Sequence, residues 1–259
     1  MIFDTHCHLT SSRYKKILDS VINEAKAAGV SQFMVPGTDL KNSEKAVQIS
    51  KNFKDIDVGV GIHPESITET SSSSTLIDEV KQIEQLITEN QVKAVGEIGL
   101  DIHAPQPLLQ RELFIAQCKL ALIYKKSIII HSRGTADTLL EILTTDFLNK
   151  LTVPVVFHCC EPNLDLLTFA QQHHIYIGVD GDLSYNEDKQ RFIAQVPLNL
   201  LVVETDAPYL LPEPLRSQKA YPNVPKNIVL TIEKIAEVKN IEKGKLEAQL
   251  FQNSVKLFS

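Results

Sequence analysis

The sequence lacks the usual features of a secreted or membrane-spanning protein. Its 4 cysteines include no C-x-x-C pair, and the adjacent Cys159 and Cys160 cannot readily bridge each other. No charged segment followed by an apolar one stands at the N-terminus, and no apolar run approaches the length of a membrane span. These absences predict a cytoplasmic protein in a reducing compartment, with no signal peptide and no membrane partner.

The chain also lacks an excess of positive charge. Its formal net charge is -6 at pH 7, which argues against a protein that coats nucleic acid unselectively, because such binding needs many cations to meet phosphate. A nuclease with a local basic groove, or with metal ions that neutralise phosphate, is still compatible with this charge.

The 259 residues are 43% hydrophobic and 22% charged, enough for one sizeable core, and we expect a single domain over residues 1–259. Short β-type runs alternate with amphipathic helical stretches. Strands are expected at residues 1–5, 32–35, 58–62, 92–96, 127–130, 153–157, 176–179 and 200–203. Helices are expected at residues 14–28, 42–52, 75–89, 107–125, 135–148, 164–173, 188–195, 225–239 and 243–258.

This alternation of eight strands with helices predicts a parallel α/β fold. Several strands are near-continuous apolar runs, as expected when both faces of a sheet are covered. The glycine-rich fingerprint of a doubly wound dinucleotide fold is absent after the first strand. We therefore predict a (β/α)8 TIM barrel, whose usual length of ~250 residues this chain matches.

Ionisable residues follow several of the predicted strands. His6 and His8 would project to the same side of an extended backbone and could share a metal ion, although a lone His pair is more often packing or surface. The full set consists of His6, His8, His63, Glu97, His131, His158 and Asp206. In a barrel the strand ends converge on one mouth, and burying these groups together is costly unless a metal pairs them.

The number of these ligands predicts two divalent ions rather than one. Glu97 can bridge the ions through its two carboxylate oxygens, and two ions ~3.5–4 Å apart can clamp a phosphoryl oxygen. An imidazole-rich set suits Zn²⁺ or Mn²⁺, whereas Mg²⁺ prefers oxygen ligands. The identity of the ions among Mg²⁺, Mn²⁺ and Zn²⁺ stays open.

Six motifs, taken in order, resemble the TatD family of metal-dependent deoxyribonucleases, which are TIM-barrel metallohydrolases of the amidohydrolase-like group. They are FDTHCHL (3–9), GIHP (61–64), GEIGLD (96–101), IHSR (130–133), FHC (157–159) and VETDAPYL (203–210). The resemblance implies a Mg²⁺-dependent 3′→5′ exonuclease that acts on DNA ends and also on RNA.

The resemblance also implies a role for each site residue. One metal would be held by His6, His8, Glu97 and Asp206, and the other by Glu97, His131 and His158. The catalytic residues would be Asp206, which orients the attacking hydroxide, and the bridging Glu97. Substrate phosphate would meet His63 and Arg133.

The chain departs from the family pattern in loops expected at the mouth. After His158 it has Cys-Cys-Glu-Pro where Cys-Phe-Ser-Gly is common, and Asp180-Gly181-Asp182 stands where a Ser-Gly pair is usual. Tyr221 replaces a common Glu. Added negative charge would repel polyphosphate. The alternatives are hydrolysis of an ester or amide such as aminoacyl-tRNA, and a non-enzymatic scaffold with a vestigial metal site.

Overall fold

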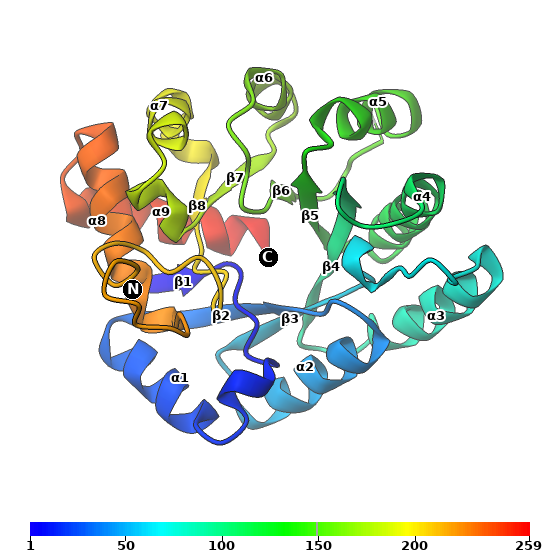
Figure 1. Ribbon diagram of the computed structural model, residues 1–259, viewed down its shortest axis with the longest axis horizontal. Helices are drawn as coiled ribbons and strands as arrows, with labels where there is room; N and C mark the ends of the chain where they lie inside the picture. The colour runs from blue at the N-terminus through cyan, green and yellow to red at the C-terminus, as the bar shows by residue number, and fades with distance from the viewer. Residues whose placement is uncertain (149) are drawn as a thin grey trace.

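The computed structural model describes residues 1–148 and 150–259. Eight parallel strands pair in sequence order and curl into a near-closed barrel ringed by helices (Figure 1), so the predicted (β/α)8 fold is confirmed. The strands are β1 (Ile2–Asp4), β2 (Val30–Pro36), β3 (Ile56–Val60), β4 (Val92–Asp101), β5 (Ser127–Arg133), β6 (Val155–Phe157), β7 (Tyr176–Val179) and β8 (Leu201–Val203).

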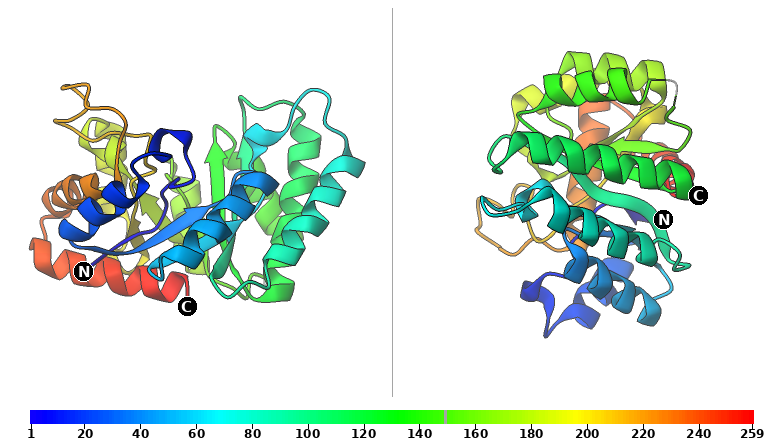
Figure 2. Two further views of the ribbon diagram at one scale, coloured as in Figure 1. Left: turned by 90° about the horizontal axis from the view of Figure 1, so that it is seen from below. Right: turned by 90° about the vertical axis from the view of Figure 1, so that its right-hand side faces the viewer.

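Eight of the described helices surround the barrel, and a ninth lies across one end of it. They are α1 (Leu18–Ala27), α2 (Leu40–Asn52), α3 (Ser73–Leu86), α4 (Pro107–Tyr124), α5 (Ala136–Asp146), α6 (Leu164–His173), α7 (Glu187–Gln195), α8 (Ile228–Lys239) and α9 (Lys243–Leu257). The left view of Figure 2 shows α9 beside both termini, while the connection between β8 and α8 rises at the opposite end. None of the described helices combines the length and the hydropathy needed to cross a bilayer.

The apolar core has two parts, one on each face of the sheet. Ile129 packs inside the barrel with Phe3, Met34 and Phe258, whereas Ile128 and Ile130 face the surrounding helices in the larger cluster. Successive strand residues point to opposite faces. Both faces are therefore apolar, which explains the near-continuous hydrophobic runs of the sequence.

The barrel closes where the first and last strands end. Thr5 N–H donates to Val203 O at 3.1 Å, and His8 N–H donates to Ala207 O at 2.7 Å. An isolated parallel bridge also joins Cys7 to Ala207. Because these residues lie beyond β1 and β8, the segments that carry the His-x-His pair and the acidic motif hold the barrel shut.

Two strands continue well past their predicted ends. β4 runs on to Asp101 and β5 to Arg133, so Glu97 and His131 lie within strands, and the prediction that they follow strand ends is wrong. The pairing of β4 with β5 shifts register between Val95 and Ile98. Such an irregularity re-aims a side chain without ending the strand, which is how Glu97 reaches the barrel mouth.

Gly99 allows β4 to continue beside β5. Its φ is +152°, and a Cβ there would lie 1.9 Å from the backbone oxygen of His131. Gly99→Ala should therefore lower the free energy of unfolding by about 1–3 kcal/mol, as overpacking does. Urea titration followed by circular dichroism measures this loss.

Gly244→Ala is the matched control, because its Cβ would meet the flexible carboxylate of Glu242 first, at 3.1 Å. It should be neutral or slightly stabilising. Equal stability of the two variants would show that the contact between β4 and β5 tolerates a side chain.

Candidate metal centre

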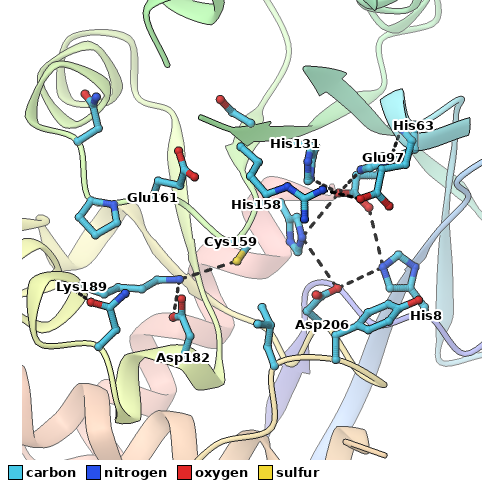
Figure 3. A pocket seen from close by; sticks show the side chains of 18 of the residues that line it. His8, His63, Glu97, His131, His158, Cys159, Glu161, Asp182, Lys189 and Asp206 are labelled. Atoms are coloured by element: carbon cyan, nitrogen blue, oxygen red, sulfur yellow. Dashed lines mark hydrogen bonds and ion pairs between the residues drawn. The ribbon is translucent and has the colours of Figure 1, made fainter. Parts of the chain in front are cut away.

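Four side-chain atoms, from His6, His8, Glu97 and Asp206, face one another at the barrel mouth. Figure 3 shows three of these residues, His8, Glu97 and Asp206. The Nε2 atoms of His6 and His8 are 3.3 Å apart, His6 Nε2 is 3.3 Å from Glu97 Oε2, and His8 Nε2 is 3.2 Å from Asp206 Oδ1. Cys7, between the two histidines, is buried on the other side of the backbone. Ligands bound tetrahedrally at ~2.1 Å are separated by ~3.4 Å, so this set could hold one metal ion.

A second group of imidazoles surrounds the other oxygen of the Glu97 carboxylate. Glu97 Oε1 is 3.0 Å from His131 Nδ1, 3.3 Å from His63 Nε2 and 3.7 Å from His158 Nε2. The two oxygens of one buried carboxylate therefore face two different donor groups. This arrangement suits a carboxylate that bridges two cations.

Carboxylates behind two of the histidines determine which ring nitrogen is available to a metal. His131 Nε2 lies 2.8 Å from Asp101 Oδ2, and His158 Nδ1 lies 3.0 Å from Glu204 Oε1. A ring nitrogen that faces a carboxylate carries the proton, which leaves a lone pair on the other nitrogen. Nδ1 of His131 and Nε2 of His158 are thus the atoms available to a metal ion, and both lie near Glu97 Oε1.

His63, unlike His131 and His158, carries its ring proton on the nitrogen that faces the site. Its Nδ1 accepts a hydrogen bond from the backbone N–H of Glu65 at 3.0 Å, so Nε2 carries the proton and points toward Glu97. A protonated nitrogen donates a hydrogen bond and cannot bind a metal at the same time. The geometry therefore makes His63 a hydrogen-bond donor rather than a metal ligand, and its contact with substrate phosphate stays a prediction.

Glu204 is a functional residue that sequence reasoning missed. Its carboxylate contacts His158 and also accepts the backbone N–H of Cys159 at 2.6 Å, and the residue is 1% exposed. Gly178 on β7 leaves room for it, because a Cβ there would lie 2.5 Å from Glu204 Oε1. The available signal was a second acid two residues before Asp206 in the same motif.

The carboxylates of the centre are buried and need positive charge beside them. Burial by itself raises the pKa of Glu97, but the neighbouring imidazoles, His63 foremost, outweigh burial and hold that pKa well below its ordinary value. Burial lowers the pKa of His158, but the carboxylates of Glu204 and Glu97 raise it to about 10. Divalent cations would take the place of any proton on the metal-facing nitrogens of His131 and His158 and would supply the positive charge themselves. The donor set therefore fits metal ions.

A cavity of about 1250 Å³ opens over the centre, and of the other residues expected at the mouth Arg133, Glu161 and Asp182 line it, whereas Asp180 and Tyr221 do not. Arg133 Nη2 is 2.5 Å from Glu65 Oε1 and 2.6 Å from Asp101 Oδ2. Glu161 accepts the backbone N–H of Gly134 with both oxygens, at 2.9 and 3.1 Å. Glu161 thus links the loops that follow β5 and β6.

Lys189 on α7 offsets part of the negative charge expected after β7. Its Nζ lies 2.8 Å from Asp180 Oδ2 and 2.6 Å from Asp182 Oδ1, and its side chain is 1% exposed. Burial by itself raises the pKa of Asp180, but the Lys189 ammonium outweighs burial and holds that pKa below its ordinary value. The sequence shows the two acids but not the cation between them.

Removing this cation should destabilise the fold. Lys189→Met leaves Asp180 buried without a counter-charge, and breaking a buried pair in this way costs about 3–5 kcal/mol. Urea unfolding at pH 8, where both carboxylates tend to ionise, measures the loss. Because the pKa of Asp180 is depressed, its pairing stabilises the fold above the ordinary Asp pKa and is lost at lower pH.

Lys81→Met is the control, since Lys81 forms a surface pair with Asp78 and such pairs contribute little. The double variant Lys189→Met with Asp180→Asn should recover part of the loss. If Lys189→Met unfolds at the same urea concentration as the unmodified protein, Lys189 does not neutralise the pair.

Comparison with known proteins identifies relatives that span the chain. The sequence model of the TatD related DNase family matches residues 3–259. The uncharacterized metal-dependent hydrolase YabD of Bacillus subtilis is 28% identical over 100% of this chain and 99% of its own length. The 3′-5′ ssDNA/RNA exonuclease TatD of Escherichia coli is 28% identical over 99% of this chain and 98% of its own length.

A solved structure agrees with these relatives. The crystal structure of YjjV, a TatD homologue from Escherichia coli, superposes with a TM-score of 0.88 at 28% identity, over 99% of this chain and 97% of that one. The whole barrel is therefore shared, including the strands that carry the candidate ligands.

Proposed function

The chain belongs to the family of TatD-related DNases and is a metal-dependent hydrolase, and we propose that it hydrolyses phosphodiester bonds at the 3′ ends of single-stranded DNA or RNA. The observation that carries this proposal is the Glu97 carboxylate, whose two oxygens face separate donor groups. Two bridged divalent ions suit phosphoryl transfer. The exonuclease activity of the Escherichia coli relative supports the same reaction.

Each residue of the centre would have its own role in this reaction. Bound divalent ions would lower the pKa of the attacking water and neutralise charge on the phosphoryl oxygens. Asp206 Oδ1 would accept the proton of that water, and its position is held by a hydrogen bond from Asp206 N–H to His6 O at 2.9 Å. His63 Nε2–H would donate to a phosphoryl oxygen, and Asp101 and Glu204 would hold the ligating imidazoles in orientation.

A second candidate reaction changes the bond and keeps the metal centre. The guanidinium of Arg133 already faces the carboxylates of Glu65 and Asp101, and the ammonium of Lys189 faces Asp180 and Asp182. Both cations are thus engaged by acids. A cavity lined in this way favours a reacting group with no negative charge of its own, such as the ester that joins the amino acid to the 3′ end of an aminoacyl-tRNA. The donor groups gathered around Glu97 argue against a non-enzymatic scaffold.

Metal content tests the bridging role of Glu97. Glu97→Gln should lose both ions, because one side chain serves both donor groups, whereas His131→Ala should mainly weaken one. Mass spectrometry of the metal bound per chain, after dialysis against Mg²⁺, Mn²⁺ or Zn²⁺, measures both effects. His174→Asn, at an exposed position after α6, is the control and should retain full occupancy. A Glu97→Gln protein with full metal content would rule out the bridge.

The reaction is tested with 5′-labelled oligonucleotides of DNA and RNA, incubated with each divalent ion. The proposal expects products shortened one nucleotide at a time from the 3′ end. A 3′-aminoacylated oligonucleotide in parallel distinguishes the second candidate, which expects loss of the aminoacyl group from an intact strand. Failure of every ion to support either reaction would count against both candidates.

Asp206→Asn is the active-site control for this assay. It should fold normally and lower kcat by about 10²–10⁴-fold, since a neutral amide cannot accept the proton of the attacking water. Thermal unfolding checks the fold, and metal analysis separates the loss of a base from the loss of a ligand. Near-normal turnover would show that another group accepts the proton.

A further inference from the structure

We propose that Glu65 is a specificity-determining residue whose carboxylate occupies the phosphate-binding edge of Arg133 and must be displaced before substrate phosphate can bind there. This inference rests on the proposed phosphodiesterase function. Glu65 Oε1 lies 2.5 Å from Arg133 Nη2, and both residues line the cavity beside the metal centre. No other described contact of the Glu65 carboxylate competes with this one.

The two carboxylates on Arg133 differ in how firmly they are held. Asp101 has a fully buried side chain, accepts the backbone N–H of His103 at 2.8 Å and contacts His131 Nε2 at 2.8 Å. The Glu65 side chain is 57% exposed. Asp101 is thus a permanent partner of the guanidinium, whereas Glu65 can swing into solvent.

The location of Arg133 makes the Glu65 contact relevant to substrate. Arg133 pairs with Asp101 across β5 and β4 and stands two residues after His131, a candidate ligand. A guanidinium fork matches the oxygens of a phosphate as well as those of a carboxylate. The Glu65 carboxylate therefore takes the place that a phosphate oxygen would otherwise occupy.

Competition of this kind weakens the binding of substrate and of phosphate-bearing product alike. The contact is partly exposed, and exposed ion pairs are worth little, so the expected effect is modest. We expect about a fivefold change in phosphate affinity, smaller at high ionic strength because salt screens exposed charges. A carboxylate that merely oriented Arg133 would have the opposite effect, since its loss would weaken binding.

Glu65→Gln tests the proposal with little disturbance elsewhere. The backbone N–H that holds His63 Nδ1 is unchanged by the substitution, and the amide has the shape of the carboxylate without its charge. We expect KM for an oligonucleotide to fall about fivefold with kcat nearly unchanged. Calorimetric titration with inorganic phosphate should show a Kd lowered by a similar factor.

Asp188→Asn is the matched control. Asp188 lines the same cavity but contacts Arg191, with Oδ1 2.6 Å from Nη2. It removes the same charge from the cavity without touching Arg133, so KM and phosphate affinity should change less than twofold. Equal effects of the two substitutions would indicate that losing any negative charge from the cavity raises phosphate affinity, and would overturn the specific role of the contact between Glu65 and Arg133.

A double variant ties the effect to Arg133. Arg133→Gln removes the guanidinium that both carboxylates contact, and in that background Glu65→Gln should no longer change phosphate affinity. An undiminished effect there, or an unchanged or weakened phosphate affinity in Glu65→Gln alone, overturns the proposal. Failure of the unmodified protein to cut any oligonucleotide would count against the phosphodiesterase function, while the phosphate titrations would still decide the role of Glu65.

Discussion

The structure depends on one buried carboxylate that needs positive charge on both of its oxygens. Glu97 is 3% exposed, and an ionised carboxylate in such a place is costly unless it is paired. The barrel meets this need by bringing imidazoles from β5 and from the segments after β1, β3 and β6 to its two sides. The register shift in β4, the glycine that follows it and the closure between the segments after β1 and β8 all place these groups around Glu97.

A second layer of acids determines what those imidazoles can do. Asp101 and Glu204 leave the ligating nitrogens of His131 and His158 directed at Glu97, while a backbone N–H gives His63 the reverse tautomer. Histidines that look alike in the sequence thereby divide into candidate metal ligands and a hydrogen-bond donor. The difference comes from what lies behind each ring rather than from the ring itself.

The cavity around the centre has more acids than cations: Arg133, Lys189 and Arg191 line it together with Glu65, Glu97, Glu161, Asp182, Asp188 and Asp206. Its acids meet partners: Asp180 and Asp182 share Lys189, and Glu65 contacts Arg133. A polyanion approaching this mouth finds cations that are already engaged, so affinity for phosphate depends on exchange of partners.

The sequence by itself determined the barrel, the family and the residues gathered at the mouth, because apolar runs, helix periodicity and strand-end motifs are local patterns. Their roles as metal ligands stay predictions. The tertiary structure alone decided that β4 continues past Glu97, that Glu204 supports His158 and that Lys189 neutralises two acids. The contact between Glu204 and His158 joins residues far apart in the sequence. The continuation of β4 depends on a backbone irregularity, and Lys189 comes from a helix that returns over the loop after β7. Such contacts leave no periodic trace in the chain, since a side chain's partner is set by the fold and not by its neighbours in sequence.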